Sequence, residues 1–389
     1  KAGEIRSILE ALEFHCQVEG DSASPEATIR AKVPDHRLDV ELPADLIEEL
    51  ARVYGYDRLP ETLMSDVLPP QRRNLALEGE EKIRDVLVGA GLQEVITYSL
   101  THLESVARLH PSGPAPNPAG YVRLANPLST EREFMRQTLM NGLLETVAAN
   151  LRHTDRVALF EVGSVYLPQE GEPLPIEPRR VAVALCGPRQ DLHWDRQTAA
   201  PFDYFDLKGI VEVLLARLGL RDARFEPTEH PTFEPGRVAS LRHRDEVLGV
   251  LGEVHPQVRE AFGLPSERPV ALAELDLEQI LALAQPVPVA EPLSRFEVAT
   301  EDLAFIVPNH VPAEAVRQAI LRAGGKLLRG VILFDVYEGE PVPQGHRSLA
   351  FALTLQADDH TLTGEEIAQV RARIARGVER EVGGQLRST

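Results

Sequence analysis

Residues 34–60 read PDHRLDVELPADLIEELARVYGYDRLP, and this stretch decides how the N-terminal part of the chain is interpreted. Pro43 is followed by apolar residues at helical spacing, namely Leu46, Ile47, Leu50 and Val53. This pattern predicts a helix that begins just before Asp45. Asp45, Glu48 and Glu49 stand at i, i+3 and i+4, so we expect their side chains on one face of that helix.

The carboxylates around the start of this helix form a candidate cation site. Asp39 lies one short loop upstream of the three helical carboxylates. Negative charge is favoured near a helix N-terminus, and clustered hard oxygens without His or Cys suit Mg²⁺ or Ca²⁺ rather than zinc. The alternative is a solvated acidic face, which the spacing alone leaves open.

The same stretch resembles the signature of the bacterial phenylalanyl-tRNA synthetase beta subunit, within a winged-helix-like domain. The matching segments are Pro34 to Asp39, Asp45 to Leu50, Arg52 to Asp57, and Pro60. In that family Mg²⁺ is bound at the positions of Asp39, Asp45, Glu48 and Glu49. The resemblance therefore implies a magnesium site, because all four positions hold carboxylates here.

Composition and charge bound the class of protein. The chain has 389 residues and a net charge of −19, which argues against a general nucleic-acid binder. Two distant cysteines, Cys16 and Cys186, suggest neither a disulfide framework nor a zinc site. No membrane-length apolar run or signal-like N-terminus is evident, so we expect a cytoplasmic protein and no membrane partner. Residues 291–389 carry 11 Lys and Arg against 14 Asp and Glu, so an RNA contact is most plausible there.

Two proline-rich joints, at residues 68–71 and 285–292, predict three domains at 1–70, 71–284 and 291–389. For the middle domain we expect an α+β layer on an antiparallel sheet, with a hairpin around Arg244-Asp245. Helices are predicted at 80–90, 141–151 and 207–218. Strands are predicted at 94–100, 157–167, 180–186, 238–243, 247–254 and 270–275.

The middle domain also resembles the beta subunit, in the same order along the chain. The matching motifs are Asn126-Pro127-Leu128-Ser129 with Glu131, Met135-Arg136, Leu159 to Gly163, Phe205 to Gly209, and Gly249 to Pro256. In the family this is a class II synthetase-like module that has lost catalysis and packs against the catalytic alpha subunit. We expect structural roles for Arg156 and Glu161, because no complete ATP site surrounds them. His230 and His255 each precede a proline and are expected to be turn residues.

The C-terminal segment predicts the order βαββαβ, a ferredoxin-like fold, with a capping box at Thr363 to Glu366. It resembles the ferredoxin-fold anticodon-binding domain of the same subunit. Side chains at strand ends or loops are candidates for tRNA binding, with an aromatic stacking platform: Lys326, Arg329, Tyr337, His346 and Arg347. A solvated sheet edge is the alternative. Arg371, Arg373, Arg376 and Arg380 form a basic stretch on the last helix that could pair with acids or face phosphate.

Together these resemblances imply the C-terminal half of a phenylalanyl-tRNA synthetase beta subunit, a fragment without the N-terminal tRNA-binding and editing regions. The implied role is to scaffold the catalytic alpha subunit and bind tRNA(Phe) in an (αβ)₂ heterotetramer. ATP would bind at alpha and Mg²⁺ to this chain, and no catalytic residue is expected here. A non-catalytic class II paralogue that acts as an RNA-binding or regulatory module is the alternative.

Overall fold

The computed structural model describes residues 1–387 except 25, 128, 130–131, 192, 196–198, 221, 286 and 291. Leu128 and Glu131 of the middle-domain motifs, and Pro286 of the second joint, therefore lie outside the described residues. The chain separates into two compact units, Lys1–Leu75 and Ala76–Thr389. Among the described residues, no helix combines the length and apolar character needed to cross a membrane.

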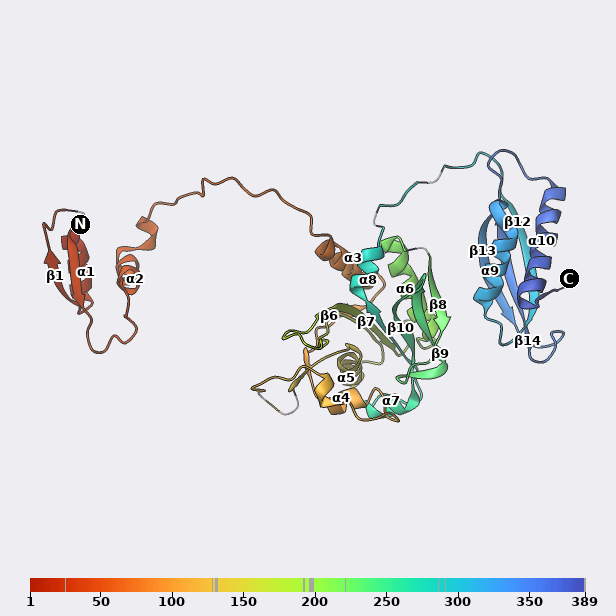
Figure 1. Cartoon of the computed structure of the whole chain (residues 1–389), viewed down its shortest axis with the longest axis horizontal. Helices are drawn as coiled ribbons and strands as arrows, with labels where there is room; N and C mark the ends of the chain where they lie inside the picture. The colour runs from red at the N-terminus through yellow and green to blue at the C-terminus, as the bar shows by residue number, and fades with distance from the viewer. Residues whose placement is uncertain are drawn as a thin grey trace. The chain divides into compact units, whose positions relative to one another are not determined.

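The first unit contains two α-helices and one antiparallel hairpin (Figure 1). In chain order its elements are α1 (Ala2–Ala11), β1 (His15–Glu19), β2 (Thr28–Lys32), α2 (Pro43–Tyr54) and the 3-10 helix η1 (Tyr56–Arg58). Its core is small and centres on Leu9, Phe14, Cys16 and Val40. The helix predicted near Asp45 is confirmed as α2, while the winged-helix assignment stays a prediction.

A seven-stranded sheet organises the middle of the chain, in the order β3-β6-β7-β11-β10-β9-β8. Its strands are β3 (Gln93–Glu94), β6 (Val157–Ser164), β7 (Arg179–Cys186), β8 (Ala223–Pro227), β9 (Phe233–His243), β10 (Glu246–Val254) and β11 (Val270–Asp276). All neighbours are antiparallel except β3 and β6. The predicted hairpin is confirmed, because His243 pairs with Glu246 across Arg244-Asp245.

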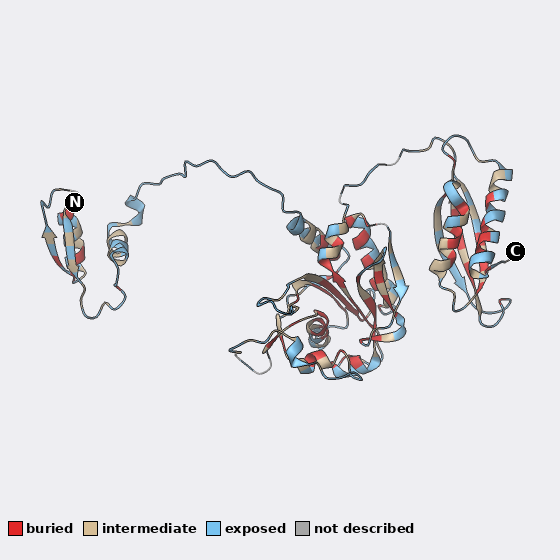
Figure 2. Ribbon diagram, viewed as in Figure 1, coloured by how far each residue is buried: buried red, intermediate tan, exposed pale blue. Residues whose placement is uncertain are grey.

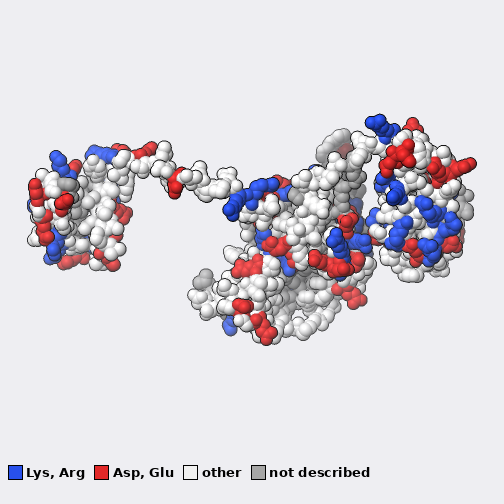
Figure 3. Space-filling model, turned by 45° about the horizontal axis from the view of Figure 1, so that its top comes forward, with Lys and Arg blue, Asp and Glu red and all other residues white. Residues whose placement is uncertain are grey.

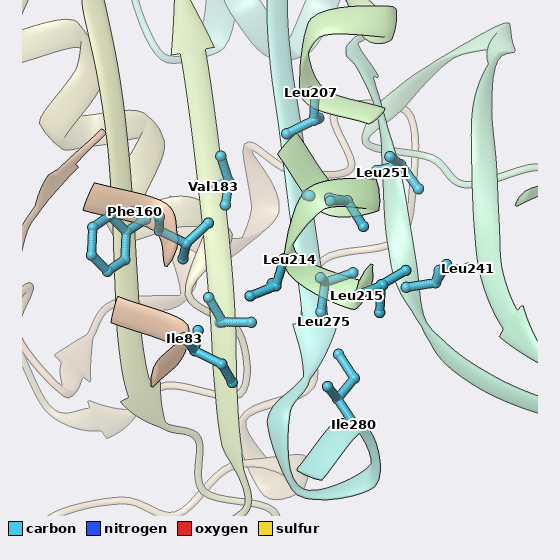
Figure 4. Packing of buried hydrophobic residues seen from close by; sticks show 14 of the residues in the cluster. Ile83, Phe160, Val183, Leu207, Leu214, Leu215, Leu241, Leu251, Leu275 and Ile280 are labelled. Atoms are coloured by element: carbon cyan, nitrogen blue, oxygen red, sulfur yellow. The ribbon is translucent and has the colours of Figure 1, made fainter. Parts of the chain in front are cut away.

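Helices cover both faces of this sheet, and its central strands β6, β7 and β11 are largely buried (Figures 1 and 2). One face packs against α3 (Leu75–Gly89), α6 (Tyr204–Leu218) and α8 (Leu277–Leu283). Figure 4 shows Ile83, Leu214 and Ile280 converging on Phe160, Val183 and Leu275 in this core. The other face packs against α5 (Met140–Asn150) and α7 (Pro256–Ala261). Smaller elements are α4 (Leu103–Ala107), η2 (Pro118–Gly120) and the pair β4 (Leu100–Thr101) and β5 (Phe134–Met135).

The predicted strand at 94–100 is wrong in its extent. Only Gln93–Glu94 and Leu100–Thr101 are strands, and they belong to different sheets. Val95 still donates its N–H to Phe160 O at 2.9 Å, but the N–H of Thr97 donates to the Glu161 side chain at 3.2 Å. A buried carboxylate thus takes the backbone donor that a strand would have used, and the chain leaves the sheet.

The C-terminal domain confirms the βαββαβ order. Its elements are β12 (Ala299–Pro308), α9 (Ala313–Gly324), η3 (Gly325–Leu327), β13 (Leu328–Tyr337), β14 (His346–Leu355), α10 (Gly364–Val382) and β15 (Gln385–Leu386). The sheet order β13-β14-β12-β15 is that of a ferredoxin-like fold, and the helices pack on it around Phe305, Ile320, Phe351 and Ile374. The predicted capping box begins α10, and Gly383 in the left-handed region ends it at φ 67°.

Candidate metal-binding and RNA-contact sites

The start of α2 uses Asp45 as a helix cap. One oxygen of its carboxylate accepts the backbone N–H groups of Glu41 at 2.8 Å and Leu42 at 2.7 Å. These backbone donors hold the pKa of Asp45 below its usual value, because they stabilise the charged form. The carboxylate is therefore ionised at neutral pH and already engaged with the backbone.

Arg37 lies between two of the other predicted metal ligands. Its Nη2 atom is 2.7 Å from Asp39 Oδ2 and 2.9 Å from Glu49 Oε1, and Glu49 also accepts from Arg52 at 2.5 Å. The bond from Arg37 lowers the pKa of Asp39 to about 2 and also holds down the pKa of Glu49. Arg37 was not among the predicted site residues, although it lies only two positions before Asp39 in the sequence.

The four predicted ligands are thus arranged unequally. Asp39 and Glu49 share Arg37, Asp45 caps α2, and Glu48 is exposed. Over the described part of the chain, no group of three or more His, Cys, Asp or Glu side chains is placed to hold a metal ion. The donor chemistry suits a hard cation, but the arrangement of this single chain does not form a ligand set, because a guanidinium neutralises two of the carboxylates.

A buried ion pair lies at the heart of the middle domain. Arg136 Nη1 is 2.7 Å from Glu161 Oε1, and the side chains are only 6% and 1% exposed. Thr97 completes the cluster, since its hydroxyl donates to Glu161 at 2.7 Å and accepts from Arg136 at 2.9 Å. Arg136 also donates to Ser164 O at 3.0 Å. The two charged side chains pair with each other, so we interpret the cluster as structural rather than catalytic.

Two glycines make this cluster possible. A Cβ atom on Gly163 would overlap the Arg136 guanidinium, and one on Gly142 would lie 2.8 Å from Thr97 Oγ1. These positions explain why glycine follows Phe160-Glu161-Val162 on β6 and Asn141 on α5. An adjoining cavity of about 330 Å³ is lined by Tyr98, Arg132 and Thr146 among others, and Arg132 lies over the Tyr98 ring at 3.9 Å.

Three other candidate residues of this domain, Arg156, His230 and His255, contact neighbouring groups of the fold. Arg156 lies over the Phe202 ring at 5.1 Å. His230 Nδ1 accepts the N–H of Thr232 at 3.3 Å, and His255 Nδ1 accepts that of Gln257 at 3.2 Å. Burial lowers the pKa of His230 to about 4, so its ring is neutral at physiological pH. The expected turn roles of both histidines are therefore consistent with their hydrogen bonds.

The predicted RNA-contact residues fall into two groups in the C-terminal domain. Lys326 and Arg329 lie in η3 and at the start of β13. Tyr337 lies at the other end of β13, across from Ser348, with His346 and Arg347 at the start of β14. Tyr337 lies eight residue steps along β13 from Arg329, which is about 26 Å at 3.3 Å per step. One compact contact cannot include both groups.

Some of these side chains are already engaged within the domain. Arg329 forms an ion pair with Asp358, and half-buried Arg347 donates to Val311 O at 2.8 Å. Tyr337 donates to Glu340 O at 2.7 Å while Arg387 lies over its ring at 5.8 Å. Figure 3 shows basic and acidic side chains interspersed on the visible face of this domain.

Comparison with known proteins places all three parts of the chain. Residues 59–277 match the family described as "Phenylalanyl tRNA synthetase beta chain CLM domain", 294–387 the "Ferredoxin-fold anticodon binding domain", and 1–56 the "tRNA synthetase B5 domain". A pyrrolysyl-tRNA synthetase structure from Desulfitobacterium hafniense has a TM-score of 0.42 and 17% identity, covering 54% of this chain and 68% of that one. That likeness is too low to carry an argument.

Two relatives are named "Phenylalanine--tRNA ligase beta subunit". The protein of Symbiobacterium thermophilum is 41% identical over 95% of this chain and 41% of its own length. That of Moorella thermoacetica is 40% identical over 98% of this chain and 46% of its own length. The chain thus spans less than half the length of these relatives. Its three matched domains and near-complete coverage establish that it belongs to the phenylalanine–tRNA ligase beta subunit family.

Proposed function

We propose that this chain is the part of a phenylalanine–tRNA ligase beta subunit that scaffolds the catalytic alpha subunit and binds tRNA(Phe). The aminoacylation itself, with ATP, would take place at alpha, in a cytoplasmic (αβ)₂ assembly. The observation that carries this proposal is the colinear match of three domain families over nearly the whole chain. The proposal includes domains at 1–70, 71–284 and 291–389, the first winged-helix-like and the second class II synthetase-like.

Affinity purification from the native organism tests this assembly. A tagged copy of the chain should bring down an alpha subunit in equal amount, and the complex should attach phenylalanine to tRNA(Phe). If the chain is recovered alone from cells that also contain alpha, the result would instead favour the alternative function, a class II paralogue that acts without a synthetase partner. The control is an unrelated tagged protein of similar net charge, which should not bring down alpha.

The two groups of candidate RNA contacts call for separate variants. Lys326→Ala with Arg329→Ala removes the basic side chains of η3 and of the start of β13. His346→Ala with Tyr337→Phe changes the side chains at the end of β13 and the start of β14. Arg347 is left intact because it donates to Val311 O, and its loss could disturb the fold. If the proposal is right, at least one double variant weakens tRNA binding by the assembled enzyme and leaves phenylalanine activation unchanged. Unaltered tRNA affinity in both would place the contact elsewhere.

Magnesium binding by Asp39, Asp45, Glu48 and Glu49 is the second part of the proposal. Their carboxylate oxygens are the donors that Mg²⁺ prefers, and the depressed pKa values of Asp39, Asp45 and Glu49 keep these three ionised. Because Arg37 neutralises two of the four, we propose that the ion binds in the assembled enzyme rather than to the free chain. Mn²⁺ soaked into the assembled enzyme should give an anomalous peak beside these residues. If no anomalous peak appears beside these residues, the proposed magnesium site is wrong.

A further inference from the structure

The two helices of the C-terminal domain carry a basic surface that the candidate RNA contacts do not include, apart from Lys326. Arg373, Arg376 and Arg380 stand at i, i+3 and i+7 on α10, so they share one face of the helix. Arg322 and Lys326 lie at the end of α9 and in η3. We refer to these five residues as the α9–α10 basic seam.

Contacts between the helices join Arg373 and Arg380 of α10 to the C-terminal end of α9. Arg373 donates to Ala323 O at 2.5 Å and to Gly324 O at 2.6 Å, at the C-terminal end of α9. Arg322 forms an ion pair with Glu381 of α10 at 2.5 Å, and Arg380 reaches the same carboxylate at 3.5 Å. The seam therefore follows the line along which α9 and α10 lie side by side (Figure 1).

The seam has more cations than its local acids neutralise. Glu381 is shared by Arg322 and Arg380, while within the described residues no carboxylate lies within 4.0 Å of the Arg373 or Arg376 guanidinium. Arg376 donates only to Ala372 O at 3.2 Å among the described groups. Elsewhere in this acidic chain arginines are commonly paired, as Arg317 is with Glu314 at 2.7 Å. An uncompensated basic surface on a chain of net charge −19 suits an anionic partner.

We propose that the α9–α10 basic seam binds the phosphate backbone of RNA, without reading its sequence. This inference rests on the proposed tRNA-binding role and adds a surface on the helical side of the domain. Arg373 to Arg380 spans about 10 Å of helix, a length over which one nucleic-acid strand presents about three phosphates. Guanidinium groups match phosphate geometry, and the seam offers no aromatic side chain on which a base could stack.

The test compares arginines on the same helix. Arg376→Ala and Arg380→Ala, alone and together, remove seam charges, while Arg373 stays because it caps α9. Arg371→Ala is the matched control, since Arg371 is also exposed but lies about 140–180° around α10 from the three seam arginines. Alanine favours helix, so these exposed changes should preserve α10.

Binding of the full chain is measured between 50 and 300 mM KCl with two probes, a tRNA(Phe) transcript and an RNA duplex of unrelated sequence. We expect the double variant to bind both probes about tenfold or more weakly at 100 mM salt. Its slope of log K against log salt should fall by about 1.8, which corresponds to two lost phosphate contacts. Arg371→Ala should stay within twofold of the unaltered chain.

Several results would overturn the proposal. These are unchanged salt slopes in the double variant, an equal effect of Arg371→Ala, failure of the unaltered chain to bind the duplex, or a loss confined to assembly with alpha. Arg376→Gln with Arg380→Gln, which keeps polar side chains, serves if the alanine variant loses helical circular dichroism. Failure to recover alpha would overturn the proposed function but would leave these slopes interpretable, so the two failures are distinguishable.

Discussion

Arg136 and Glu161 show how a single pair can determine local structure in the middle domain. Replacing Arg136 by Met would leave Glu161 buried beside Thr97 without its cation. We expect a loss of about 3–5 kcal/mol in the free energy of unfolding, since one partner of a buried pair is removed. Urea unfolding followed by circular dichroism measures this loss. Arg152→Ala, at an exposed position, is the control and should change stability by less than about 0.5 kcal/mol.

A second variant separates charge from packing at the same place. If the cost comes from the unpaired Glu161 carboxylate, Arg136→Met combined with Glu161→Gln should recover part of the lost stability. A double variant as unstable as, or less stable than, Arg136→Met would show that lost packing over Gly163 dominates instead.

Arg37 offers the corresponding test at the candidate metal site. Its Nη2 atom contacts both Asp39 and Glu49, so Arg37→Met should free two carboxylates for a cation. We expect the free chain to bind Mn²⁺ about tenfold more tightly after this change. Electron paramagnetic resonance titration gives the affinity. Arg30→Met, which breaks an exposed pair with Glu19, is the control, and equal affinities in all three proteins would contradict the competition.

Among individual residues, the candidate metal ligands could be predicted from the sequence, but the side chains that pair with them could not. The spacing of Asp45, Glu48 and Glu49 follows from helix geometry, which is local and therefore readable. The ion pair of Arg136 with Glu161 joins residues 25 positions apart, one directly after β5 and the other in β6, and no local pattern encodes it. A resemblance had singled out both residues as motif positions, yet their mutual contact needed the fold.

Helix α10 begins with a capping box that the sequence predicts. Thr363 Oγ1 accepts the N–H of Glu366 at 3.3 Å, and the Glu366 carboxylate accepts the N–H of Thr363 at 2.9 Å. Thr363→Ala should lower the free energy of unfolding of the C-terminal domain by about 1 kcal/mol, because a helix donor loses its acceptor. Hydrogen exchange of the α10 backbone amides in the full chain measures this change in free energy. Thr361→Ala, two residues before the cap, should have almost none.

The same cap predicts a pH dependence. Backbone and hydroxyl donors at Thr363 lower the pKa of Glu366 to about 2 from 4.5, so the charged carboxylate stabilises the folded state above pH 4.5 and this contribution is lost as pH falls toward 2. Asp359 and Glu366 raise the pKa of His360 above 6.5. The protonated His360 ring therefore stabilises the folded state fully below pH 6.5, and this second contribution is lost as pH rises further. The stability difference between the unaltered chain and Glu366→Gln should therefore be largest between pH 4.5 and 6.5. A difference that does not shrink near pH 2 would assign the effect to hydrogen bonding alone.

Elements differ in how far the sequence determines them. The C-terminal domain was predictable because its apolar alternation, capping box and Gly383-Gly384 stop all agree with one fold. The 94–100 segment was not, since its β-rich residues are overridden by the bond from Thr97 to Glu161. The short edge strand β8 was also missed, because its five residues include Pro227 and two charged side chains.

Over the whole chain, charge is distributed unevenly between the C-terminal domain and the rest. Residues 291–389 are nearly balanced while the rest holds most of the net −19, so RNA binding should depend on a local surface and fall steeply with salt. The middle domain has the opposite character, because its buried cations are paired internally and its sheet faces are filled by apolar side chains. This contrast fits the proposed division, in which the chain binds and positions RNA while another subunit supplies the chemistry.

The proposed division also bears on the activity of the isolated chain. The purified chain should show no phenylalanine-dependent exchange between ATP and pyrophosphate, because Arg136 is held by Glu161, Thr97 and Ser164 O and is not available to bind phosphates. Addition of the alpha subunit should restore exchange, and Arg376→Ala with Arg380→Ala should not reduce it, since the seam is proposed to act only on RNA. Exchange by the chain alone, after mass spectrometry has excluded contaminating alpha, would mean that the middle domain retains a catalytic site. In that case the paired cluster would have to open when substrates bind, and Arg136→Met would abolish the exchange.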